Sequence, residues 1–92
     1  MGRMRQLTKE ERRAERARLY AGLEDGSISL AEAVRTMRAV AGMTQEEYAS
    51  RVAGVSKTAL AQIERGDGNP RLSTLQAIGE AFGLEVGFVR RG

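Results

Sequence analysis

Residues 44–66 read TQEEYASRVAGVSKTALAQIERG, and this stretch decides the fold of the 92-residue chain. Thr44 precedes Glu47 at the spacing of a capping box. In that motif the hydroxyl accepts the third helical N–H, and the acid reaches back to the N–H of the cap. A helix is therefore expected at 45–53, and Gly54 follows it where a left-handed residue is needed to end it.

A second helix is expected at 57–65, with Ser56 as its N-cap, although Ala59 leaves that capping box incomplete. Small Ala49 lets the two helices approach closely, and Val55 fills the angle between them. Two short helices joined by such a turn form a helix-turn-helix, whose second helix enters the major groove of DNA.

Similar start and stop signals recur on both sides of this stretch, and they predict further helices near 9–25, 30–41 and 74–82. The other pairs at capping-box spacing are Thr8–Glu11, Ser29–Glu32 and Ser73–Gln76, and the glycines expected to end helices are Gly26, Gly42, Gly54, Gly66 and Gly83. Apolar residues at helical spacing support the later helices.

The helix at 9–25 carries charges on most of its faces. It is expected to be either a loosely docked arm or a surface for a partner. The chain is therefore divided into a charged N-terminal helix at 1–27, a DNA-binding body at 28–83 and a C-terminal segment at 84–92.

In the C-terminal segment the spacing of apolar residues changes from helical to alternating. Leu84, Val86 and Phe88 alternate with Glu85 and Gly87, which predicts a short β-strand. A lone strand leaves its backbone groups unpaired, so the same strand of a second copy is the expected partner, antiparallel about a two-fold axis. The fold class is thus all-α, with a strand that closes a homodimer.

The composition excludes several classes of protein. The chain has no cysteine and no histidine, so disulfides, a metal site and the commonest general base are not expected. No catalytic residues or cofactors are predicted, and an enzyme is the poorest interpretation. No apolar run approaches the roughly 20 residues that span a bilayer, and no signal region is visible, so a cytoplasmic protein is expected. The net charge of +3 suits a polyanionic partner.

Helix geometry assigns the base-reading face. Leu60 and Ile63 must pack inward, which leaves the opposite stripe outward. The residues of that stripe are Lys57, Thr58, Ala61 and Gln62. Lysine can donate to guanine, glutamine can pair with adenine, and threonine can touch a thymine methyl group. Ala61 is small enough to permit close approach.

The segment from about residue 30 to residue 84 resembles the Xre/Cro-like helix-turn-helix family of phage repressors, small bacterial regulators and antitoxins. The matching residues are Thr44-Gln45, Tyr48-Ala49, Gly54-Val55-Ser56, Ile63-Glu64-Arg65-Gly66, Asn69-Pro70 and Leu75. Tyr48 departs from the leucine that is more usual there. The resemblance implies a five-helix, λ-repressor-like domain, to which the N-terminal helix is an addition.

The resemblance also implies roles for residues outside the stripe. The expected contacts to the DNA backbone are Gln45, Ser56, Arg65, Asn69 and Arg71, and Arg51 is a weaker candidate. For Gln45 and Ser56 the physical reason is the positive end of a helix. Arg38 and Glu64 match a partly buried ion pair that orients the recognition helix.

The sequence therefore predicts a dimeric regulator of transcription, a repressor, that binds a pseudo-palindromic operator in double-stranded DNA. The alternative is an antitoxin that also masks a toxin protein and controls its own operon. Binding to RNA or only to protein stays open, because a fold does not dictate a function.

Overall fold

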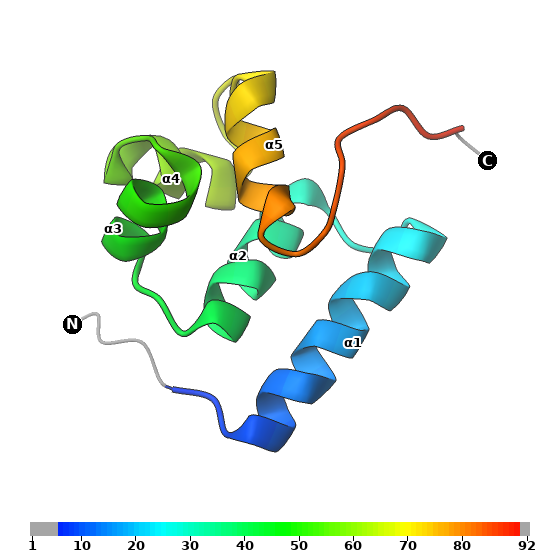
Figure 1. Ribbon diagram of the computed structural model, residues 1–92. Helices are drawn as coiled ribbons and strands as arrows, with labels where there is room; N and C mark the ends of the chain where they lie inside the picture. Colours follow the sequence, from blue (N-terminus) through cyan, green and yellow to red (C-terminus); the bar gives the residue numbers. More distant parts are fainter. Residues whose placement is uncertain (1–5, 91–92) are drawn as a thin grey trace.

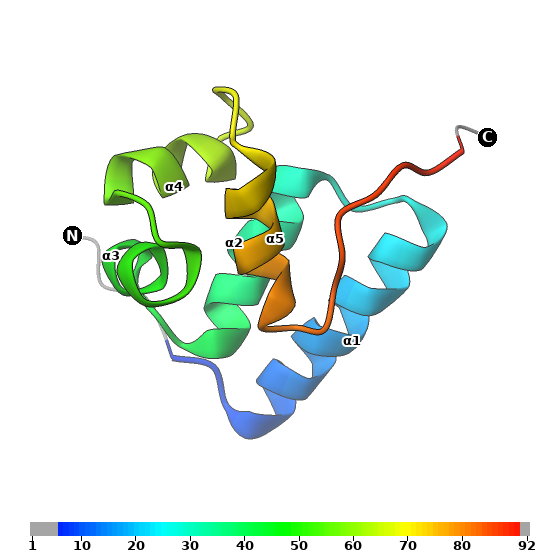
Figure 2. The ribbon, with the colours of Figure 1, turned by 45° about the horizontal axis from the view of Figure 1, so that its top comes forward.

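The computed structural model describes residues 6–90, which form an all-α domain without a strand (Figure 1). Its helices are α1 (Lys9–Asp25), α2 (Leu30–Ala41), α3 (Gln45–Tyr48), the short π-helix η1 (Ala49–Ala53), α4 (Lys57–Glu64) and α5 (Leu72–Glu80). The expected all-α class is confirmed for the described residues. α2 lies at the centre, with α1 on one side of it and the pair α3 and α4 on the other (Figures 1 and 2).

Side-chain caps begin most of these helices as the sequence predicts. Thr8 and Thr44 form complete capping boxes. The hydroxyls of Ser29 and Ser56 accept the third helical N–H of α2 and α4. The second half of the Ser29 box is not formed, because the carboxylate of Glu32 accepts a hydrogen bond from α1 instead.

The predicted cap at Ser73 is wrong. α5 begins at Leu72 with Arg71 as its N-cap, and no side chain caps it. Arg71 has extended backbone, with φ −70° and ψ 149°, and its carbonyl accepts from the N–H groups of Thr74 and Leu75. Ser73 therefore lies inside the first turn, where its hydroxyl cannot act as the cap.

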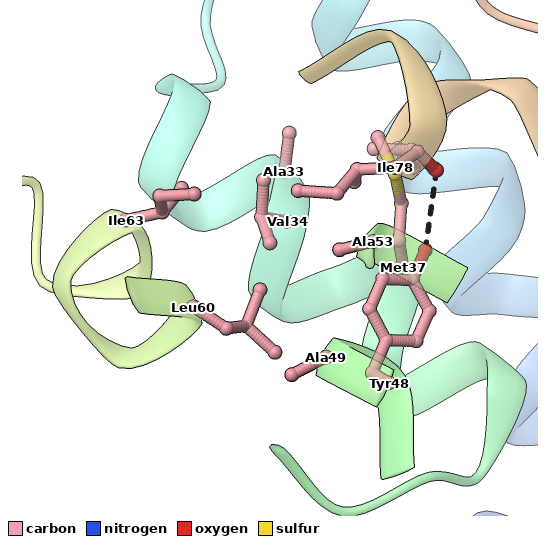
Figure 3. Close-up of a cluster of buried hydrophobic side chains, with 10 residues drawn as sticks. Ala33, Val34, Met37, Tyr48, Ala49, Ala53, Leu60, Ile63 and Ile78 are labelled. Carbon is pink, nitrogen blue, oxygen red and sulfur yellow. Dashed lines mark hydrogen bonds between the residues drawn. The ribbon is translucent and has the colours of Figure 1, made fainter. Parts of the chain in front are cut away.

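A single core joins every α-helix. The largest fully buried side chains are Leu19 of α1, Val34 of α2, Tyr48 of α3, Leu60 of α4 and Ile78 of α5. Figure 3 shows four of them converging, with the Tyr48 hydroxyl directed at the Ile78 carbonyl. Since Leu19 belongs to this core, α1 is a docked helix and not a loose arm.

The first helix of the predicted pair is regular only at its start. Residues 45–53 divide into α3 and η1, in which the carbonyl of Ala49 accepts from the N–H of Gly54 and also from that of Val55. These wide turns take the place of the last α-helical turn before Gly54, whose φ of +69° ends the helix. Periodicity over nine residues cannot distinguish the two helix types, so the sequence predicted one plain helix.

Two tyrosines hold the C-terminal end of α5 from different elements. Tyr48 donates to the carbonyl of Ile78 at 3.3 Å, and Tyr20 of α1 donates to that of Phe82 at 2.9 Å. The guanidinium of Arg16 lies 5.9 Å from the centre of the Phe82 ring. These contacts satisfy carbonyls that a helix end otherwise leaves without a partner, and they fix the point from which the C-terminal segment departs.

Residues 84–90, here called the tail, form no strand in the single chain. The strand predicted from Leu84, Val86 and Phe88 is therefore not supported, since no other segment of residues 6–90 pairs with it. Leu84 differs from the other two residues because it packs against the core of its own chain, and its N–H donates to Gly79 at 3.0 Å. The tail leaves the molecule on the side away from α4 (Figures 1 and 2).

Candidate nucleic-acid interface

The helix-turn-helix consists of α3 with η1, a turn at residues 54–56, and α4. The N–H of Val55 donates back to Ala49 at 3.0 Å, and the half-buried Val55 side chain packs against the core. Ala49 is 1% exposed. The turn is thus closed by backbone bonds and by apolar packing together, which sets the angle at which α4 leaves it.

α4 presents a polar stripe away from the core. Leu60 and Ile63 are buried, and the predicted base-reading residues lie on the other side of the helix. Lys57, Thr58 and Gln62 are exposed, whereas Ala61 is half-buried. The stripe therefore consists of donors and acceptors around a small, recessed residue, an arrangement that suits the edges of base pairs.

Glu64 anchors the end of α4 and is only 4% exposed. The structure brings Arg38 to it, with Nε donating to Oε2 at 2.7 Å and Nη2 donating to Oε1 at 3.0 Å. Arg38 Nη1 also donates to the carbonyl of Met43 at 3.2 Å. A buried carboxylate needs such partners because its desolvation is costly, and the two-pronged geometry fixes its direction.

Gln45 also binds Glu64, and the cluster of Arg38, Gln45 and Glu64 is called the anchor below. Its Nε2 donates to Glu64 Oε1 at 3.0 Å, and the residue is half-buried. The Gln45 side chain thus ties the start of α3 to the end of α4. The DNA-backbone contact predicted for Gln45 depends on main-chain N–H groups at the start of the helix and stays a prediction.

Arg35 is a contact that the sequence analysis missed. Its Nη1 donates to the main-chain carbonyl of Glu64, at the C-terminal end of α4. A cation at that end also interacts favourably with the helix dipole. Arg35 precedes Arg38 by three residues and so shares a face of α2 with it. That spacing was the available signal, since Arg38 was already expected to meet Glu64.

Tyr48, the last residue of α3, is fully buried. Burial is the larger cause, and the negative charge of Glu64 the smaller one, of a rise in its pKa from 10.0 to about 12. The phenol stays protonated at neutral pH and is able to donate to Ile78. Tyrosine in place of the leucine more usual at this position thus adds a hydrogen bond between α3 and α5.

The remaining predicted backbone contacts lie at the two ends of α4. The hydroxyl of Ser56 accepts the N–H of Ala59 at 3.1 Å, so it is occupied as a cap. Asn69 and Arg71 are exposed and line a groove of about 450 Å³ together with Gln62. The groove thus joins the loop after α4 to the outward stripe.

Two arginines named by the sequence analysis differ in their partners. Arg65 is 60% exposed at its side chain, and its Nε lies 3.2 Å from Oδ2 of Asp67. Arg51 is exposed on η1, and within residues 6–90 it forms no ion pair. Contact of either arginine with DNA stays a prediction.

The predicted dimer residues do not act as one set. Leu84 is half-buried in its own subunit, Val86 is 41% exposed, and Phe88 is fully exposed. Val89, next to Phe88, is 90% exposed. The apolar surface that the tail offers thus begins at Val86 and not at Leu84.

Comparison with known families identifies the class of this protein. A family model described as helix-turn-helix matches residues 34–89, which include the whole turn, the anchor and residues 84–89 of the tail. The chain belongs to the Xre/Cro-like helix-turn-helix family and is, at this level, a DNA-binding regulator. A search of curated proteins and a search of solved structures give no match. Among the described helices, none has the length and apolar character needed to cross a membrane.

Proposed function

We propose that this chain is a sequence-specific, duplex DNA-binding transcriptional regulator, a repressor, that acts in the cytoplasm as a homodimer. α4 enters the major groove, and Lys57, Thr58 and Gln62 read base edges around Ala61. The observation that carries this proposal is the outward polar stripe on a helix whose buried end is fixed by Glu64. A helix held in this way presents its side chains to DNA at a constant angle.

Contacts to phosphate position the helix. The exposed Arg71 and Asn69 lie beyond the end of α4, and Ser56 lies at its start. Main-chain N–H groups at the start of α4 and the guanidinium of Arg71 are both suited to phosphate oxygens. Such contacts fix the register of the protein on the duplex and carry no sequence information.

Dimerisation through the tail is part of this proposal. Two recognition helices must reach major grooves about one helical turn apart, or 34–36 Å. Val86, Phe88 and Val89 give the tail an apolar surface that its own chain leaves exposed. Pairing two tails antiparallel satisfies their backbone groups and covers these side chains.

A binding selection on random duplex DNA tests the proposal. The expected result is an inverted repeat, with adenine favoured at one position per half-site and guanine at another, as Gln62 and Lys57 predict. Failure of the full-length protein to bind duplex DNA at low salt, or enrichment of no sequence at all, contradicts it.

An antitoxin that controls its own operon is the second candidate. The observation that favours it is the exposure of Tyr20 and Leu23 on α1, at 36% and 38%, since exposed apolar groups are suited to a protein partner. A toxin-like gene next to the one for this chain is the expected finding. If no such gene is present and the protein binds an operator, the repressor is favoured over the antitoxin.

A further inference from the structure

Arg65 extends the outward stripe of α4 by one turn. It follows Ala61 by four residues and Gln62 by three, so it shares their face of the helix. Its N–H still donates to both of their carbonyls, at 3.1 Å and 3.2 Å. By position Arg65 therefore belongs with the base-reading residues, although the sequence analysis assigned it to the DNA backbone.

The backbone that carries Arg65 and its partner is closely constrained. The N–H of Asp67 donates to the carbonyl of Gln62 at 2.9 Å, which folds the chain back onto the last turn of α4. Gly66 and Gly68 flank Asp67 with φ values of +80° and +79°, a conformation that glycine adopts without strain. Arg65 and Asp67 thus extend their side chains from a fixed loop.

The ion pair between Arg65 and Asp67 involves only the Nε atom of the guanidinium. Nε of Arg65 lies 3.2 Å from Oδ2 of Asp67, and within residues 6–90 no other side chain bonds to Arg65. The two terminal nitrogens remain available. Together they form a fork that matches O6 and N7 of guanine in the major groove.

The charge of the pair argues against phosphate as the ligand. Asp67 neutralises Arg65 locally, and its carboxylate, 65% exposed, repels a phosphate placed beside it. Arg71 provides the contrast, since it forms no ion pair in the described part of the chain and keeps its whole charge for the DNA backbone. A neutral pair is better suited to the uncharged edge of a base.

We propose that Arg65 reads a guanine through its terminal nitrogens and that Asp67 is the positioning residue that holds it for this contact. The proposal rests on the function proposed above and adds one base position to each half-site. Holding the arginine in advance lowers the conformational entropy that it loses on binding DNA.

Selections on random duplex DNA with full-length wild type, Arg65→Lys and Asp67→Ala test this proposal, with Glu24→Ala as the control. Glu24 is an exposed carboxylate on α1, so its removal changes the net charge as Asp67→Ala does. Arg65→Lys keeps the charge and loses the fork. We expect it to lower the preference for one guanine per half-site by about 5- to 150-fold, the value of a bidentate contact.

Asp67→Ala is expected to lower the same preference while strengthening binding to unrelated sequences, because it removes a negative charge near the DNA. Glu24→Ala should leave the guanine preference unchanged. Both altered residues of the pair are exposed, and thermal unfolding checks that the variants fold. The proposal is overturned if Arg65→Lys leaves the preference intact, or if Asp67→Ala strengthens all sequences alike. Wild type that binds no duplex DNA instead overturns the proposed function itself.

Discussion

Two regions of the domain, the end of α4 and the tail, are built in opposite ways. At the end of α4, Glu64 is buried and receives hydrogen bonds from Arg35, Arg38 and Gln45. At the tail, Phe88 is fully exposed and no strand forms. The end of α4 is complete within a single chain, whereas the tail beyond Leu84 leaves apolar side chains exposed.

This difference indicates that DNA recognition and association draw on different sources of free energy. Folding of one chain already fixes the recognition helix, so DNA meets a surface that is ordered in advance. In the proposed homodimer the exposed residues of the tail would gain their contacts only on association, so their contribution would depend on protein concentration. Changes at the anchor should therefore act on stability, and changes at the tail should act on assembly.

The largest expected effect is on the anchor. Arg38→Ala or Glu64→Ala should lower the free energy of unfolding by about 3–5 kcal/mol, because each leaves the other charge buried without its partner. The paired change Arg38→Met with Glu64→Leu should cost less than either single change. Urea unfolding of the variants measures both. Equal losses in the single and paired variants would show that the pair is not what fixes this end of α4.

The second-largest effect is expected from truncation of the tail. Truncation after Glu85 keeps Leu84, which packs in its own core, and removes Val86 and Phe88. We expect the shortened chain to stay folded, to sediment as a monomer and to bind a palindromic site about 100-fold more weakly, since linked binding is lost. A dimer that persists with unchanged affinity would place the interface elsewhere.

Smaller effects should distinguish base reading from backbone contact. Gln62→Ala and Lys57→Ala should each cost about 1–3 kcal/mol on the selected site and relax one base position. Arg71→Ala should weaken all sequences alike and lower the salt dependence by about one counterion. Titrations at several salt concentrations on specific and random DNA measure this. An unchanged selected site in Gln62→Ala means that another face of α4 reads the bases.

The smallest effect concerns Tyr48, whose hydroxyl joins α3 to α5. Tyr48→Phe should cost about 1 kcal/mol at neutral pH, the value of one hydrogen bond. Because the pKa is raised from 10.0 to about 12, the unfolded chain loses its proton first, and the phenol's contribution is lost as pH rises through this range. The stability difference between wild type and variant should thus shrink above pH 10. A constant difference contradicts the buried, protonated phenol.

The ends of most helices followed from the sequence because they depend on residues a few positions apart. Thr8, Ser29, Thr44 and Ser56 cap helices as expected, and Gly54 has the left-handed conformation. The outward stripe of α4 followed from the same local geometry. Local rules failed at Ser73, where the spacing was right and the helix began one residue before it.

Only the tertiary structure decided which partners meet across the core. The sequence could pair Arg38 with Glu64 through the family resemblance, but the bonds of Arg35 and Gln45 to Glu64 join residues 29 and 19 positions apart. Leu84 and Val86 hold equivalent places in the alternating pattern, yet Leu84 packs in its own subunit and Val86 is exposed. A period describes the faces of a segment, whereas the neighbour that each face meets depends on how the other helices pack around it.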